Sequence, residues 1–159
     1  MRNLLPLVLS LVVLALFAYW QAAALREQRE QVRRLSTKLE FATLDLQEKC
    51  AKQAREEFKL YGWDKKEMAY VLNHYNSKLN KCFMQIEDTE FKQGTGTTNK
   101  IVSDAFEGKT YASYTWISQN DKQYWEVPPR DCKVTLPSGE EKICHSSEEF
   151  DALVKQYME

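Results

Sequence analysis

The chain has 159 residues, of which 43% are hydrophobic, 12% aromatic and 28% charged. Its 22 Lys and Arg residues nearly balance 23 Asp and Glu residues, and the net charge of -1 excludes a strongly basic nucleic-acid binder and a long acidic tail. Five glycines and four prolines exclude collagen-like and low-complexity sequences. We therefore expect one globular domain with an N-terminal appendage and no nucleic-acid partner.

Residues 1–24 are predicted to form a transmembrane anchor or a signal peptide. The run 4–24 carries no charged side chain and, as a helix of about 30 Å, is long enough to cross a bilayer. The membrane is therefore a predicted partner of this run. The alternative is a cleaved signal peptide, because Arg2 precedes the apolar run and the three alanines at 22–24 suit a cleavage site.

An amphipathic, coiled-coil-like helix is predicted over residues 25–46, next to the apolar segment. Apolar residues recur there at the seven-residue spacing of a coiled coil, which predicts a homodimer. The predicted dimer contacts are Leu25, Val32, Leu35, Leu39 and Leu46. The alternatives are a helix docked on its own domain and a solvated stalk. The helix is expected to continue to Gly62, with Cys50 on its apolar face.

Residues 47–159 are predicted to form a disulfide-stapled α+β domain. The predicted strands are residues 68–75, 79–87, 100–106, 111–118, 123–127, 132–136 and 140–144, with a flexible loop at 92–100. Ser146 and Glu149 form a capping box that begins a C-terminal helix. The predicted fold class is thus α+β: the N-terminal helix runs into an amphipathic helix, then an antiparallel meander of about six strands, then a helix packed on the sheet.

The four cysteines predict two disulfides. A hairpin centred on Ser138 places Cys132 opposite Cys144, which leaves Cys50 to pair with Cys82. Four free thiols are the alternative; a zinc site and a redox-active pair are disfavoured because no Cys-x-x-Cys motif occurs.

The predicted disulfides indicate where the domain lies. Such bonds persist in oxidising compartments, so we expect the C-terminal domain to be membrane-anchored outside the cytoplasm, on the periplasmic side in a bacterium. It would be secreted if residues 1–24 are cleaved. The basic residues that follow the apolar run favour the opposite orientation, but they alternate with acidic residues and suit a charged helix face.

Two groups of residues are candidate binding sites. The first is a polar group beside a predicted turn, formed by Asn73, His74, Tyr75 and Asn76. The second is an aromatic strip on neighbouring strands, represented by Tyr114, Trp116 and Trp125. The alternative for both groups is structural: a hairpin end for the first, and core packing with cross-strand pairing for the second.

The sequence contains no recognisable catalytic, metal-binding or cofactor-binding motif, so we expect neither an enzyme nor a cofactor. The expected function is that of a membrane-anchored or secreted envelope domain, acting as a non-enzymatic interaction or structural module with other envelope proteins. The main alternative is a secreted or anchored ligand-binding domain, such as a carbohydrate-binding domain, that uses the aromatic strip. An enzyme is the third hypothesis.

Overall fold

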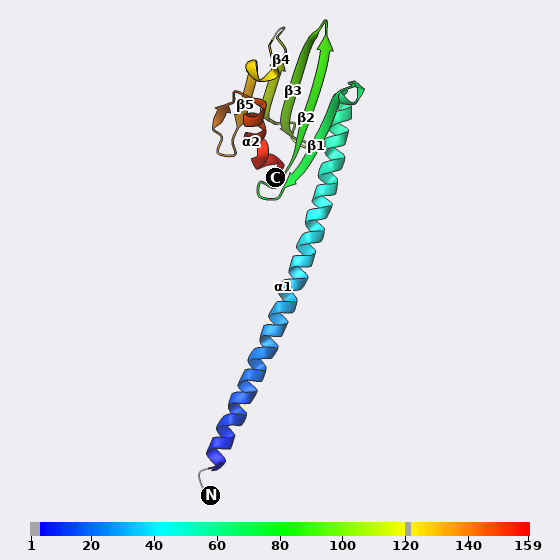
Figure 1. Ribbon diagram of the computed structural model, residues 1–159. Coiled ribbons are helices and arrows are strands. Elements are labelled where there is room, and N and C mark those ends of the chain that lie inside the picture. The colour runs from blue at the N-terminus through cyan, green and yellow to red at the C-terminus, as the bar shows by residue number, and fades with distance from the viewer. Residues whose placement is uncertain (1–3, 120–121) are drawn as a thin grey trace. The chain divides into compact units, whose positions relative to one another are not determined.

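The computed structural model describes the backbone of residues 4–119 and 122–159, and within these ranges the side chains from residue 16 onward. The chain divides into two compact units, Met1–Thr43 and Leu44–Glu159. The elements are α1 (Leu4–Leu60), η1 (Trp63–Lys65), β1 (Ala69–Asn76), β2 (Lys81–Lys92), β3 (Thr95–Asp104), β4 (Thr110–Ile117), η2 (Tyr124–Glu126), β5 (Asp131–Thr135), β6 (Glu141–Ile143) and α2 (Ser147–Met158) (Figure 1).

The first element, α1, is a single helix of 57 residues that begins in the first unit and ends in the second. The helix ends just before Gly62, as the sequence predicts. Gly62 adopts a left-handed conformation with φ of 73°, and its N–H donates to the Lys59 carbonyl at 2.9 Å. Glycine adopts this conformation without the steric cost that a Cβ atom brings, which explains why the helix stops there.

Among the residues that the structure describes, no helix combines the length and the apolar character needed to cross a membrane. The transmembrane part of the predicted fold is therefore not supported. Much of the predicted segment falls outside the described residues, since residues 1–3 and the side chains of 4–15 are not described.

The six strands form one antiparallel sheet in the order β1-β2-β3-β4-β5-β6, which confirms the predicted meander. Alternation along β2 divides the core between the two sheet faces. Phe83 packs with Phe150 and Val154 of α2 on one face, whereas Cys82 and Met84 face the other, where they pack with the C-terminal part of α1. We call these the α2 face and the α1 face.

The predicted loop at 92–100 is wrong, because most of it belongs to β3. Gln93 and Gly94 both have positive φ, 51° and 81°, as a tight two-residue hairpin turn requires. The threonines that follow suit a strand because they are β-branched, and the hydroxyls of Thr89 and Thr98 lie 3.1 Å apart across β2 and β3. A segment rich in Gly and Thr thus forms a regular hairpin.

The predicted strand at 123–127 is also wrong, because residues 124–126 form the 3₁₀ helix η2. The Gln123 N–H donates to the Glu126 carboxylate at 2.8 Å, which closes the turn locally. The prolines at 128 and 129 then prevent regular strand pairing. The turn predicted just before this segment includes Asn120 and Asp121, which lie outside the described residues.

The C-terminal hairpin and helix agree with the predictions. Val134 lies opposite Lys142, and the Cys144 N–H donates to the Cys132 carbonyl at 3.0 Å. The Ser146 hydroxyl accepts a hydrogen bond from the Glu149 N–H at 3.2 Å, so this serine caps α2 as expected.

Both disulfides are present with the predicted pairing. Cys50 bonds to Cys82 across 32 residues and joins α1 to β2, while Cys132 bonds to Cys144 across 12 residues and joins β5 to the segment after β6. All four cysteines are buried. Two such bonds are typical of proteins from an oxidising, extracytoplasmic or secreted environment.

Candidate functional site

The predicted polar group at the end of β1 does not form a single site. Alternation along the strand sends Asn73 and Tyr75 to the α1 face, and His74 and Asn76 to the α2 face. Asn76 is buried: its side-chain oxygen accepts two backbone N–H groups of the following turn at 3.0 and 3.1 Å, and its amide donates to a carbonyl near the end of α2 at 2.9 Å. Asn76 therefore ties the β1–β2 turn to α2.

The three predicted aromatic residues have different surroundings. Tyr114 is buried in the core on the α2 face. Trp116 is half-buried, with its ring centre 4.9 Å from that of Tyr124, and its indole N–H donates to the Val127 carbonyl at 3.1 Å. Trp125 lies exposed on η2. Internal packing and hydrogen bonding thus explain the positions of two of these rings, Tyr114 and Trp116.

A buried lysine under α2 was missed by the sequence analysis. The Lys100 side chain on β3 is only 9% exposed, and its ammonium group lies 2.9 and 3.0 Å from the two carboxylate oxygens of Asp151 on α2. The Ser147 hydroxyl lies 2.9 Å away, and a Glu87 carboxylate oxygen on β2 lies 3.7 Å away. One cation therefore links two strands to the first turns of α2.

The chemistry of this cluster favours a structural role. Lys100 donates to the Ser147 hydroxyl, and its ammonium group also lies within ion-pair distance of the Asp151 and Glu87 carboxylates, so its hydrogen bonds are used in holding α2 on the sheet. A cavity of about 430 Å³ adjoins the cluster. Tyr70 lines it, and burial, followed by its hydrogen bond with Glu87, raises the pKa of Tyr70 to about 12. Tyr70 therefore stays neutral at physiological pH.

Replacing the linking cation is expected to loosen α2. Lys100→Met should lower the free energy of unfolding by about 2 kcal/mol, since hydrogen bonds to charged groups are lost and a methionine of similar length fills the space. Urea denaturation followed by circular dichroism measures the effect. Lys155→Met, on the exposed side of α2, is the control and should change stability by less than about 0.5 kcal/mol. Equal effects of the two variants would show that Lys100 has no linking role.

A second ionic cluster holds the turn between β3 and β4. Asp104 is buried, and one of its oxygens accepts the N–H groups of Phe106 and Glu107 at 2.8 and 3.0 Å, while the other lies 2.9 Å from the Lys81 ammonium. Burial raises the pKa of Asp104, but the hydrogen bonds from Lys81 and the two N–H groups outweigh it, so the pKa of this carboxyl is lowered overall.

This lowered pKa gives a pH-dependent prediction. A carboxyl whose pKa is lower in the folded than in the unfolded chain stabilises the fold above the unfolded value of about 3.9, and this stabilisation is lost as the pH falls through the folded value. Asp104→Asn should therefore be less stable than the wild-type chain at pH 7, with the difference shrinking near pH 3. Thermal denaturation at both pH values tests this. Asp64→Asn, which removes one exposed carboxylate in η1, is the control for the loss of a single negative charge.

The two edges of the sheet differ sharply. The edge strand β6 has three residues and includes Glu141 and Lys142, and short, charged edges resist pairing with another chain. The edge strand β1 has eight residues, none of them charged and none Gly or Pro. Within the described ranges, β2 alone forms backbone hydrogen bonds with β1. The outer edge of β1 is therefore an open, regular template for another strand.

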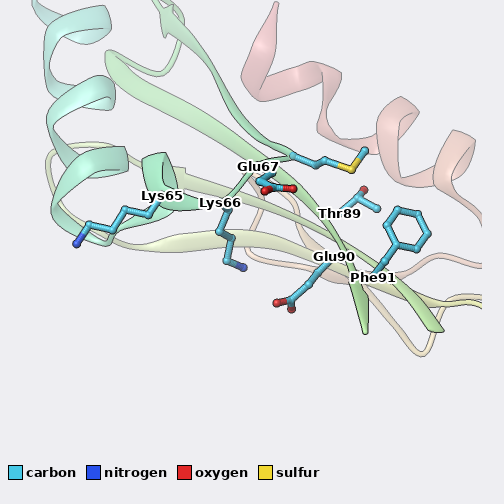
Figure 2. A pocket seen from close by; sticks show the side chains of 7 residues that line it. Lys65, Lys66, Glu67, Thr89, Glu90 and Phe91 are labelled. Carbon is cyan, nitrogen blue, oxygen red and sulfur yellow. The ribbon is translucent and has the colours of Figure 1, made fainter. Parts of the chain in front are cut away.

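Apolar side chains lie beside this open edge. Tyr70 and Leu72 of β1 both belong to the α2 face, and they are 48% and 51% exposed. A hollow of about 330 Å³ lies at the start of β1, and in Figure 2 the Phe91 ring lies apart from the Lys66 and Glu90 side chains. Two lysines and two glutamates line the hollow, so it carries no net charge that would select an ion.

The predicted dimer stripe of α1 is also exposed. In the first unit its side chains are more than half exposed, and they are Leu25, Val32, Leu35 and Leu39. The last predicted contact, Leu46, is 38% exposed and belongs to the second unit. The stripe thus has no partner among the residues that the structure describes.

The chain matches no protein-family model, and no curated protein or solved structure matches it. Among the described residues, no group of three or more His, Cys, Asp or Glu side chains is placed to hold a metal ion. A functional conclusion therefore rests on the exposed stripe of α1, on the open edge of β1 and on the disulfides.

Proposed function

We propose that this protein is an exported, non-enzymatic interaction module of the cell envelope, which pairs with a second copy through residues 25–46 and presents its C-terminal domain outside the cytoplasm to other envelope components. The single observation that carries the proposal is the pair of buried disulfides, because such bonds persist in oxidising compartments. The apolar run 4–24 supports export, either as a retained anchor or as a cleaved signal peptide.

The pairing of the helix is supported by its exposed stripe and by the charges beside it. In a parallel coiled coil with Leu25, Val32 and Leu39 at the first heptad position, Lys38 lies near Thr43 of the second copy, and Gln31 lies near Ser36 of the second copy. No like charges face each other across this seam. Burying leucine and valine side chains of this kind is the main driving force for coiled-coil association.

Export is tested by counting thiols. Full-length protein recovered from its native membrane is alkylated with and without prior reduction, and its intact mass is measured. The proposal expects no alkylated cysteine without reduction and four after it. Four cysteines alkylated without reduction would contradict export, and the same mass shows whether residues 1–24 are retained.

Helix pairing is tested by engineered crosslinks in the full chain. Because the native cysteines are paired, an introduced cysteine is the one reactive thiol. Val32→Cys is expected to form a disulfide-linked dimer on mild oxidation, whereas Glu30→Cys, on the opposite side of the helix, is not. A chain that is monomeric by light scattering and fails to crosslink at position 32 would rule out this pairing.

A carbohydrate-binding domain is less well supported. Of the three aromatic residues predicted for that role, Trp125 is exposed, while Tyr114 and Trp116 are held in internal packing. Glycan-dependent quenching of tryptophan fluorescence that disappears in Trp125→Ala would revive this alternative.

A further inference from the structure

We infer that the open edge of β1 pairs with β1 of a second copy of the chain in antiparallel register, so that two six-stranded sheets become continuous. This inference rests on the proposed function, because it gives the interaction module a second self-association surface with a defined geometry. The surface lies entirely within the second unit, residues 44–159, and shares no residue with the stripe of residues 25–46.

The backbone of β1 sets which residues can pair. The Thr89 N–H donates to the Met68 carbonyl at 3.0 Å, so these directly opposite residues form a hydrogen-bonded pair. Hydrogen-bonded and non-hydrogen-bonded pairs alternate along an antiparallel ladder. The even-numbered residues of β1 therefore bond to β2, and the backbone groups of Ala69, Val71, Asn73 and Tyr75 point toward the open edge.

A two-fold axis that passes between the Leu72 residues of the two copies lets these outward-pointing backbone groups pair. It places Val71 opposite Asn73 of the second copy, and Ala69 opposite Tyr75 of the second copy, so that outward-pointing backbone groups meet in every hydrogen-bonded pair. It also keeps the paired residues within Ala69–Asn76, the length of the strand. An isologous contact of this kind is the usual way in which identical chains form a closed dimer.

The side chains agree with the same register. Leu72 lies opposite Leu72 of the second copy in a non-hydrogen-bonded pair, in which side chains approach most closely. Tyr70 lies opposite His74 of the second copy on the same face. Since Leu72 and Tyr70 are about half exposed in the single chain, pairing removes apolar surface from water.

Charge also favours a second copy. Like charges opposite each other destabilise a strand pair, and β1 contains no charged residue, so self-pairing places none together. An extended segment of another envelope protein is the competing occupant of this edge. The second copy is favoured because the register centred on Leu72 pairs outward-pointing backbone groups and also brings the exposed Leu72 side chains together, with the residues of this strand alone.

The test uses disulfide crosslinking of the full chain. Leu72→Cys is expected to form an interchain disulfide on mild oxidation, because the two-fold axis places this position opposite itself. Asn73→Cys is the matched control, because Asn73 is also exposed and lies one residue away. In this register Asn73 lies opposite Val71 of the second copy and not opposite Asn73, so this variant should crosslink at least ten-fold less. As a second measurement, Tyr70→Cys and His74→Cys chains should crosslink when mixed and remain uncrosslinked when oxidised separately.

Three results would overturn the inference. The first is that the Leu72→Cys chain stays unlinked. The second is that Leu72→Cys and Asn73→Cys crosslink equally, and the third is that Leu72→Cys captures a different protein. Each would show that a second copy does not pair here in this register. The Val32→Cys crosslink is read independently. A crosslink at Leu72 without one at Val32 would contradict the helix dimer and support the strand pairing. A crosslink at Val32 without one at Leu72 would support the helix dimer and contradict the strand pairing.

Discussion

Phe83→Ala is expected to lower the free energy of unfolding by about 3–5 kcal/mol, the usual cost of removing a fully buried phenylalanine. Phe83 has no exposed surface and lies at the centre of an aromatic cluster, with its ring centre 5.4 Å from that of Tyr111 and 4.8 Å from that of Tyr157. Truncation leaves a cavity between β2 and α2 that these rigid rings fill only in part. Urea denaturation at neutral pH, with the disulfides intact, measures the change.

The same strand supplies a matched control. Phe91 is also a phenylalanine of β2, but it is 69% exposed, and its ring lies against Gly96. Phe91→Ala is expected to cost less than about 1 kcal/mol, since little buried surface is lost. If the two variants were equally stable, the core on the α2 face would not be packed as described.

Removing the Cys50–Cys82 disulfide by a double alanine substitution is expected to lower stability by about 4 kcal/mol. In the chain-entropy model a disulfide stabilises a protein by restricting the unfolded chain, and the effect grows with the length of the closed loop. The bond spans 32 residues, compared with 12 for Cys132–Cys144, whose removal should cost about 3 kcal/mol.

The two double variants are compared by chemical denaturation under identical conditions. Cys50→Ala/Cys82→Ala should unfold at the lower denaturant concentration, and should also expose the Ala54 side of α1 to proteolysis, because this bond joins that helix to the sheet. A larger loss from the shorter loop would show that native-state packing, rather than loop entropy, dominates the stability of these bonds.

Local signals in the sequence were sufficient for several features. The hairpin around Ser138, the Ser146 cap and the helix end at Gly62 each depend on residues a few positions apart, and the structure agrees with all three. The disulfide pairing followed from the same local geometry. The β2–β3 hairpin was missed because its Gly- and Thr-rich turn region resembles a loop, whereas the positive φ of Gln93 is visible only in the structure.

The candidate sites were harder to predict, because they depend on residues far apart in the chain. Lys100 is separated from Ser147 and Asp151 by 47 and 51 residues, so no local spacing indicates that they meet. The open edge of β1 depends on the order of strands in the sheet, which determines that β1 and β6 each have a neighbour on one side alone. The residues at 73–76 are adjacent in sequence, but the strand places Asn73 and Tyr75 on one face of the sheet and His74 and Asn76 on the other.

The bond between Cys50 and Cys82 also determines how mechanical tension would pass through the molecule. A force applied along α1 reaches β2 directly through the sulfur–sulfur bond, and the segment between the two cysteines carries none of it. The last turns of the helix, η1 and β1 are thereby shielded from stretching. Under load, the meander would be pulled from an interior strand while its outer strand β1 stays relaxed.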